Sequence, residues 1–442
     1  MDGLRQIAKT NFESYERFRD MPPGAGGGNE VLVVRVTECL TAAARIYQYT
    51  VPEDGLPVPP DYRGLGPPLR ASTADGERGK PTLDMVVIPR GDTEGIGVSK
   101  SNFIRLYNAY NVDPYLLSYI SENWYGFHQP SSPYNGAYAF FVGTVLYTLV
   151  FSFNPETMKS SAILLPRASN GFGTGPRATK ELIDILQQYL DQAHSPVTLL
   201  LAVRIHLEQW LDRTLYVQLN AIRAAETISG YGPYGGSPRR VNIDSLVSMS
   251  SQVGSLQVTL ANTARHQAIA ASLDTYLGSC LGLTRPTYGV TDPEHWRKSH
   301  AGFDEVLNAL QQQLAGGITT TKYLQERTQS QSDVAFALMT HEDAVISIDQ
   351  NSSMKAIAIV TMAFLPGTFF ATLFAVPSLQ WSQSPVIQGN FWVYWVFTLP
   401  FTVLVLLLWY GLTSDWRRDL LLLVKEGVIS KLRVTRRTRR NM

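Results

Sequence analysis

The sequence predicts an α+β membrane protein with an N-terminal cytosolic α/β domain, a long helical stalk and a C-terminal hairpin of two transmembrane helices. Two uncharged runs near the C-terminal end predict the hairpin, residues 356–376 and residues 391–412. At about 1.5 Å per residue each run reaches about 30 Å, the thickness of a hydrocarbon core. Short β-branched runs in the first half and long helical patterns in the second half predict the remaining parts.

The first half of the chain alternates between strand and helix patterns. Residues 1–82 are predicted to form a variable, partly disordered arm with one strand at 30–36, because glycine and proline dominate much of this segment. Residues 83–175 are predicted to form an α/β subdomain, since β-branched and aromatic runs alternate with helical patterns. Its expected elements are a strand at 83–88, helices at 100–111 and from Pro114, a hairpin-like pair within 138–153, and a strand at 162–165.

The second half is predicted to be helical up to and through the hairpin. Residues 176–355 form the helical subdomain and stalk, with helices expected at 178–193, 197–228 and 243–280. From residue 318 nothing breaks the helical pattern strongly before Pro366, so one helix of about 90 Å is expected to run into the first membrane span. Residues 413–442 form a basic tail.

Charge around the two runs predicts their orientation. The gap between them, residues 377–390, holds no Lys or Arg, whereas Lys355 precedes the first run and the tail is strongly basic. By the positive-inside rule, both termini lie on the cytosolic or matrix side of a two-span protein. Two buried core helices of a soluble protein are the alternative. Trp392 and Trp409 near the ends of the second run favour the membrane.

Composition excludes several other functions. A net charge of +1 over 442 residues predicts no nucleic-acid partner. The two cysteines, Cys39 and Cys280, provide neither a disulfide framework nor a cysteine-based zinc site. The sequence contains no His-Glu-x-x-His, no phosphate loop ending in Gly-Lys-Ser/Thr and no Gly-x-Ser-x-Gly, so neither an enzyme nor a cofactor is expected. A loop cluster could bind a metal, although a solvated loop is the alternative; it comprises Asp292, Glu294, His295 and His300.

One face of the first run carries a regular stripe of small and polar residues. Its members recur in steps of three and four: Asn351, Met354, Ala358, Thr361, Leu365, Thr368 and Thr372. This spacing places them on one face of a helix, and the face includes every hydroxyl of the run. In lipid such a face either packs against other helices or lines water, and both alternatives remain open.

Acidic residues gather just before the first run. Between Arg327 and Lys355 there is no other Lys or Arg, but there are four acids: Asp333, Glu342, Asp343 and Asp349. An ordinary solvated helix face is the alternative. If several copies surrounded one axis, these acids would concentrate divalent cations, so they are candidate regulatory metal ligands.

Residues 351–371 resemble the first membrane helix of the CorA-type divalent metal ion (magnesium and zinc) transporters. The matching positions are Asn351, Lys355, Phe364, Pro366, Thr368, Phe369 and Ala371. The order of parts is also similar, and residues 110–120 resemble the segment leading into that family's first cytosolic helices. The Pro/Gly-rich arm is similar to a divergent fungal CorA-like branch that lacks the Gly-Met-Asn motif.

The resemblance implies a homopentamer in a lipid bilayer, with the first span lining a pore for Mg²⁺ or another divalent cation such as Zn²⁺. Family positions add Ile357 to the pore-lining stripe. The family's outer-mouth motif, Tyr-Gly-Met-Asn, is replaced here by Phe374, Ala375, Val376 and Pro377. The alternative is therefore a relative without a working pore, which would be a membrane-anchored structural or regulatory protein.

The orientation can be tested with single cysteines in a background that lacks Cys39 and Cys280. Ser382→Cys in the predicted outer gap should react with an impermeant thiol reagent added to intact cells. Ser430→Cys in the basic tail should react only after permeabilisation, because the positive-inside rule places the tail inside. The reverse labelling pattern would contradict the predicted orientation.

Overall fold

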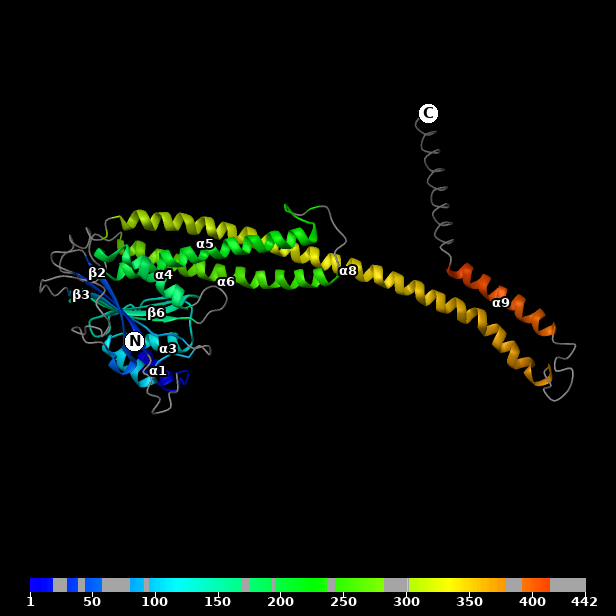
Figure 1. Cartoon of the computed structure of the whole chain (residues 1–442), viewed down its shortest axis with the longest axis horizontal. Helices are drawn as coiled ribbons and strands as arrows, with labels where there is room; N and C mark the ends of the chain where they lie inside the picture. The colour runs from blue at the N-terminus through cyan, green and yellow to red at the C-terminus, as the bar shows by residue number, and fades with distance from the viewer. Residues whose placement is uncertain are drawn as a thin grey trace, which may run out of the picture. The chain divides into compact units, whose positions relative to one another are not determined.

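The computed structural model divides the chain into two compact units, Met1–Ala335 and Phe336–Met442. The structure describes residues 1–18, 30–38, 44–57, 80–90, 95–167, 175–192, 195–234, 236, 243–281, 300, 302–378 and 392–413. The first unit combines a β-sheet with helices on both of its faces (Figure 1). The second unit contains the end of one long helix and a second apolar helix.

The described strands form one seven-stranded sheet in the order β2-β1-β3-β7-β6-β5-β4. All neighbours pair antiparallel except β3 and β7, which run parallel with Leu83 opposite Ser160 and Val87 opposite Leu164. The strands are β1 (Glu30–Glu38), β2 (Arg45–Pro52), β3 (Lys80–Val87), β4 (Gly126–His128), β5 (Tyr138–Gly143), β6 (Tyr147–Asn154) and β7 (Lys159–Pro166).

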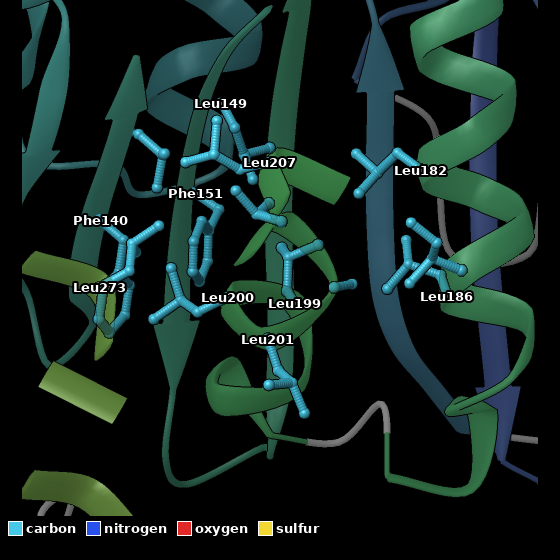
Figure 2. Packing of buried hydrophobic residues seen from close by; sticks show 14 of the residues in the cluster. Phe140, Leu149, Phe151, Leu182, Leu186, Leu199, Leu200, Leu201, Leu207 and Leu273 are labelled. Atoms are coloured by element: carbon cyan, nitrogen blue, oxygen red, sulfur yellow. The ribbon is translucent and has the colours of Figure 1, made fainter. Parts of the chain in front are cut away.

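Each face of the sheet buries a separate hydrophobic core, because alternate residues of a strand point to opposite faces. Phe140 and Phe151 lie in one core, while the adjacent Phe141 and Val150 lie in the other. The first core also receives α4 (Gly175–Gln187), α5 (Pro196–Ser229) and α6 (Ile243–Leu281) (Figure 2). The start of α8 (Phe303–Ser378) contributes to the same core. The second core receives α1 (Asp2–Glu13), α2 (Lys100–Ala109) and α3 (Leu117–Ser121).

A fully buried arginine joins three long helices of the first unit. Arg204 on α5 donates from Nε to Asp274 Oδ1 on α6 at 2.6 Å and from Nη1 to Glu208 Oε2 at 2.6 Å. Its Nη2 also donates to the Leu310 carbonyl on α8 at 3.1 Å. Burial raises the pKa of the Glu208 carboxyl although Arg204 opposes that shift. The three helices therefore share one desolvated charge cluster.

Further polar contacts follow the same bundle along its length. Gln218 donates to Thr263 at 2.8 Å and Gln267 donates to Thr321 at 2.9 Å. Arg327 on α8 donates from Nη2 to both carboxylate oxygens of Glu226 on α5 at 2.7 Å. These buried pairs need matching partners on neighbouring helices, so they fix the register of α5, α6 and α8 in the first unit.

The N-terminal segment differs from the prediction of a mobile arm. Residues 2–13 form α1, whose Phe12 is buried and stacks on Phe103. Arg5 of the same helix donates to the buried carboxylate of Asp113 at 2.8–3.2 Å. The predicted boundary at residue 82 falls within the sheet, because β1 and β2 precede it and β3 crosses it. The glycine-rich stretch at 22–28 and most of the predicted 52–82 loop lie outside the described residues.

Most other predicted elements are confirmed. The strands predicted at 30–36, 83–88 and 162–165 correspond to β1, β3 and β7, and the predicted hairpin is β5 with β6. The long helix α8 begins at Phe303, earlier than expected, and continues without interruption to Ser378. The second apolar helix is α9 (Trp392–Thr413). The division between the compact units falls after Ala335, whereas the sequence places its stalk boundary at residue 355.

Removing the buried arginine charge should destabilise the first unit. Arg204→Met leaves two buried carboxylates without their cation, which costs about 3–5 kcal/mol of unfolding free energy. Thermal unfolding of full-length Arg204→Met should show a clearly lower midpoint than that of the unmodified protein. Arg177→Gln is the matched control, because it removes an exposed ion pair with Glu181 worth less than about 1 kcal/mol. Equal midpoints for the two variants would contradict the role assigned to Arg204.

Candidate functional site

The second unit contains two helices long and apolar enough to cross a membrane. The candidate spans are Met354–Thr372 in α8 and Trp392–Trp409 in α9. Only 6 % of each span is buried within the structure, so neither resembles the core helix of a soluble protein. This exposure favours the membrane over the buried-core alternative, since large exposed apolar surfaces are rare on soluble proteins.

The helix α9 packs against one side of the first span. Tyr394 donates its hydroxyl to the Gly367 carbonyl at 3.1 Å, and Pro366 beside this glycine is buried. The ring of Phe370 lies 6.3 Å from that of Phe397 and 5.8 Å from that of Phe401. The covered side of α8 is therefore the side of Pro366, Gly367 and Phe370.

The predicted stripe lies on the opposite side. Phe370 follows Thr361 by nine residues and Thr368 by two. At about 100° per residue, each interval places Phe370 on roughly the opposite side of the helix from the threonine. Thr361, Thr368 and Thr372 are exposed, and Ala358 is half-buried. The larger stripe side chains are 66–69 % exposed: Met354, Ile357 and Leu365. Phe364 and Phe369 flank the stripe and are also exposed. No described residue of α9 covers this face.

The stripe hydroxyls donate within their own helix. Thr361 Oγ1 lies 3.1 Å from the Ile357 carbonyl and 2.9 Å from the Ala358 carbonyl. Thr368 makes the equivalent pair of contacts, and Thr372 Oγ1 lies 2.8 Å from the Phe369 carbonyl. Because each hydroxyl hydrogen points back to the helix, its oxygen offers outward lone pairs. Chemically, this face is a row of hydrogen-bond acceptors between apolar side chains.

Some predicted site residues have side chains outside the described part. Asn351 and the outer-mouth residues Phe374, Ala375, Val376 and Pro377 lie in α8, but only their helical backbone is described. Residues 379–391, which include most of the predicted outer gap at 377–390, and residues 414–442 of the predicted basic tail are not described. Their predicted roles stay predictions.

The predicted acidic residues occupy more than one position on α8. In the second unit, Asp343 lies about 100° around the helix from Glu342, and only the helical backbone of Asp349 is described. Asp343 precedes Thr361 by 18 residues, or about five turns, so it lies on the side of the stripe. Asp333 belongs to the first unit, where its carboxylate accepts from Gln329 at 3.0 Å. Within the described residues, no group of three His, Cys, Asp or Glu is placed to hold a metal.

The alternative metal cluster in the loop before α8 is only partly described. Asp292, Glu294 and His295 lie outside the described residues. His300 is buried, with its Nε2 atom 2.7 Å from the Ser195 hydroxyl at the start of α5. This histidine is thus part of the packing around α5 and is not on a solvated loop.

Sequence reasoning missed the residues on α9 that contact the first span. Tyr394, Phe397, Thr398 and Phe401 follow the spacing i, i+3, i+4, i+7, which marks one helix face. That spacing was available in the sequence. Aromatic residues surround α9 on other sides too, so the contact side could not be distinguished from a lipid-facing side.

Known proteins resemble this chain either over a short segment or at low sequence identity. No protein-family model matches the chain. The curated "Notoamide biosynthesis cluster protein M'" of Aspergillus versicolor is 31% identical over 92 residues, which is 20% of this chain and 20% of that protein. The chain thus matches only about a fifth of the length of this relative.

Two solved structures cover most of the chain at low similarity. The full-length CmaX protein has a TM-score of 0.42 and 12% identity, covering 86% of this chain and 98% of its own. The CorA magnesium transporter from Methanocaldococcus jannaschii has a TM-score of 0.38 and 9% identity, covering 85% of this chain and 96% of its own.

The uncovered stripe should meet the same stripe of other copies. In a background without Cys39 and Cys280, Thr368→Cys should form disulfides between copies when membranes are oxidised. Ala363→Cys is the matched control, because it lies five residues earlier and on the α9 side of the helix. Non-reducing electrophoresis provides the measurement. Equal cross-linking at the two positions would contradict the assignment of the faces.

Proposed function

We propose that this chain is a CorA-like membrane transporter or channel for divalent cations, with Mg²⁺ or Zn²⁺ as the transported ion. In this proposal the protein is a homo-oligomer, five copies by the sequence resemblance, and the first span of each copy lines the pore. The lining residues are those of the stripe: Asn351, Met354, Ile357, Ala358, Thr361, Leu365, Thr368 and Thr372.

The observation that carries the proposal is the position of the stripe opposite α9. A lone hairpin would expose three threonine hydroxyls of the first span to hydrocarbon, which offers their outward lone pairs no partner. Several copies around one axis would place those oxygens against water inside the assembly, while Phe364 and Phe369 remain on the flanks. Helix association in lipid also favours small residues at the contact, such as Ala358 and the threonines.

The chemistry of the face suits a hydrated divalent cation. Mg²⁺ loses its water reluctantly, so the water molecules of the ion would donate to the threonine oxygens. Leu365 lies between Thr361 and Thr368 and would narrow the path with an apolar ring, where water is easily lost. In this proposal the hydroxyls of Thr361 and Thr368 hold water on either side of the Leu365 ring, so that a hydrated ion can pass.

The acids before the span would contribute regulation in the same assembly. A ring of copies brings Asp343 of each chain to the side of the stripe, where like charges repel. Divalent cations bound there, or near Glu342, Asp349 and Asp333, would offset that repulsion and favour a closed state. Loss of these ions when internal metal falls would shift the population toward an open one.

The apolar outer mouth favours a second candidate function. Phe374, Ala375, Val376 and Pro377 provide no side-chain amide to receive a hydrated ion. A membrane-anchored structural or regulatory protein that keeps the oligomer without conducting would tolerate this replacement. Metal uptake distinguishes the two candidates directly.

The proposal predicts the effect of removing the stripe hydroxyls. The double variant Thr361→Val and Thr368→Val should lower Mg²⁺ or Zn²⁺ uptake into proteoliposomes by roughly thirtyfold, since two lost hydrogen bonds at about 1 kcal/mol each sum to about 2 kcal/mol. Thr402→Val is the matched control, because its hydroxyl donates to the Thr398 carbonyl within α9. If the unmodified protein shows no uptake above empty liposomes for any divalent ion, the transport proposal fails and the second candidate stands.

A further inference from the structure

The seam between the two spans combines packing with one directional contact. On α9 the contact residues follow the spacing of a single helix face: Tyr394, Phe397, Thr398 and Phe401. On α8 they contact Gly367 and Phe370, and Pro366 beside Gly367 is buried. Thr398 is buried, and its hydroxyl has no hydrogen-bond partner among the described residues, so it contributes packing. Tyr394 instead donates a hydrogen bond across the seam to the Gly367 carbonyl at 3.1 Å.

The seam lies beside a proline–glycine step that weakens the backbone of α8. Pro366 has no amide hydrogen, so the carbonyl of Met362, four residues earlier, lacks its usual helical donor. Gly367 follows directly and has the greatest backbone freedom of any residue type. Together they lower the resistance of the first span to twisting, halfway between Thr361 and Thr372.

A hydrogen bond resists rotation of the span more strongly than ring packing does. The rings of Phe370, Phe397 and Phe401 lie 5.8–6.3 Å apart, within a range where aromatic contacts accept many orientations. The Tyr394 bond requires the Gly367 carbonyl to stay near 3 Å with the correct angle, and it weakens steeply outside that geometry. In hydrocarbon no water replaces the lost partner.

We propose that Tyr394 is a positioning residue that fixes the rotational setting of the first span and so determines which residues of α8 face away from α9. The consequence of this role for ion flux rests on the proposed function, since only a pore shared by several copies requires the stripe to face one axis. The rotation of the first span relative to α9 is a property of one chain and is measurable without any transport assay.

The first test measures the seam within one chain. In full-length protein without Cys39 and Cys280, reconstituted in liposomes, Gly367→Cys and Thr398→Cys form a suitable pair, because a Cβ at residue 367 lies 3.8 Å from Thr398 Cγ2. Adding Tyr394→Phe should slow formation of this intrachain disulfide roughly three- to tenfold, as expected for one hydrogen bond in lipid. Adding Thr402→Val, which removes an α9 hydroxyl that bonds within α9, should leave the rate unchanged.

The second test measures which residues of the first span face other copies. With Tyr394 present, Thr368→Cys should cross-link between copies faster than Phe369→Cys, whereas Tyr394→Phe should bring the two rates together. If Tyr394→Phe leaves the rate of intrachain disulfide formation between residues 367 and 398 unchanged, the proposal is overturned. If Thr368→Cys never cross-links between copies while the intrachain rates change as expected, the shared pore fails but the positioning role of Tyr394 stands. Because Tyr394 lies in the second unit, the folding control is the helix content of the full-length Tyr394→Phe protein in liposomes by circular dichroism, which should equal that of the parent.

Discussion

The first unit depends on the buried charge of Arg204. An arginine removed from water must find carboxylates and carbonyls in place, and here they come from α5, α6 and α8 together. Sliding α5 or α6 by a turn would separate Arg204 from Asp274, at a cost of several kcal/mol, and sliding α8 would remove the Leu310 carbonyl from the buried guanidinium. The start of α8 is thereby held in one register, and the same helix ends in the first candidate span.

The elements predicted correctly are those with a strong local signal. The strand β6 is buried on both faces and is rich in aromatic and β-branched residues, which is a strong local signal for a strand. The missed elements have weak signals. In β2 only one of eight residues is buried, because it is an edge strand. The helix α1 packs through contacts between residues far apart in sequence, such as Phe12 with Phe103 and Arg5 with Asp113.

The candidate site shows the same division. The stripe of Thr361, Leu365 and Thr368 was predictable, because helical periodicity alone places these residues on one face. Which face α9 would cover was not predictable, since Tyr394 and Phe401 have the same composition as a lipid-facing surface. The structure supplies this information: within the second unit, α9 lies opposite the stripe and contacts the first span at Gly367.

We propose that other copies of this chain cover the face of the first span that α9 leaves exposed. The mass of the intact complex, measured after extraction in several mild detergents, tests this oligomer. We expect one symmetric species with a mass five times that of the 49.1 kDa chain. A monomer or dimer in every detergent would contradict it, because neither can enclose an axis with the stripe.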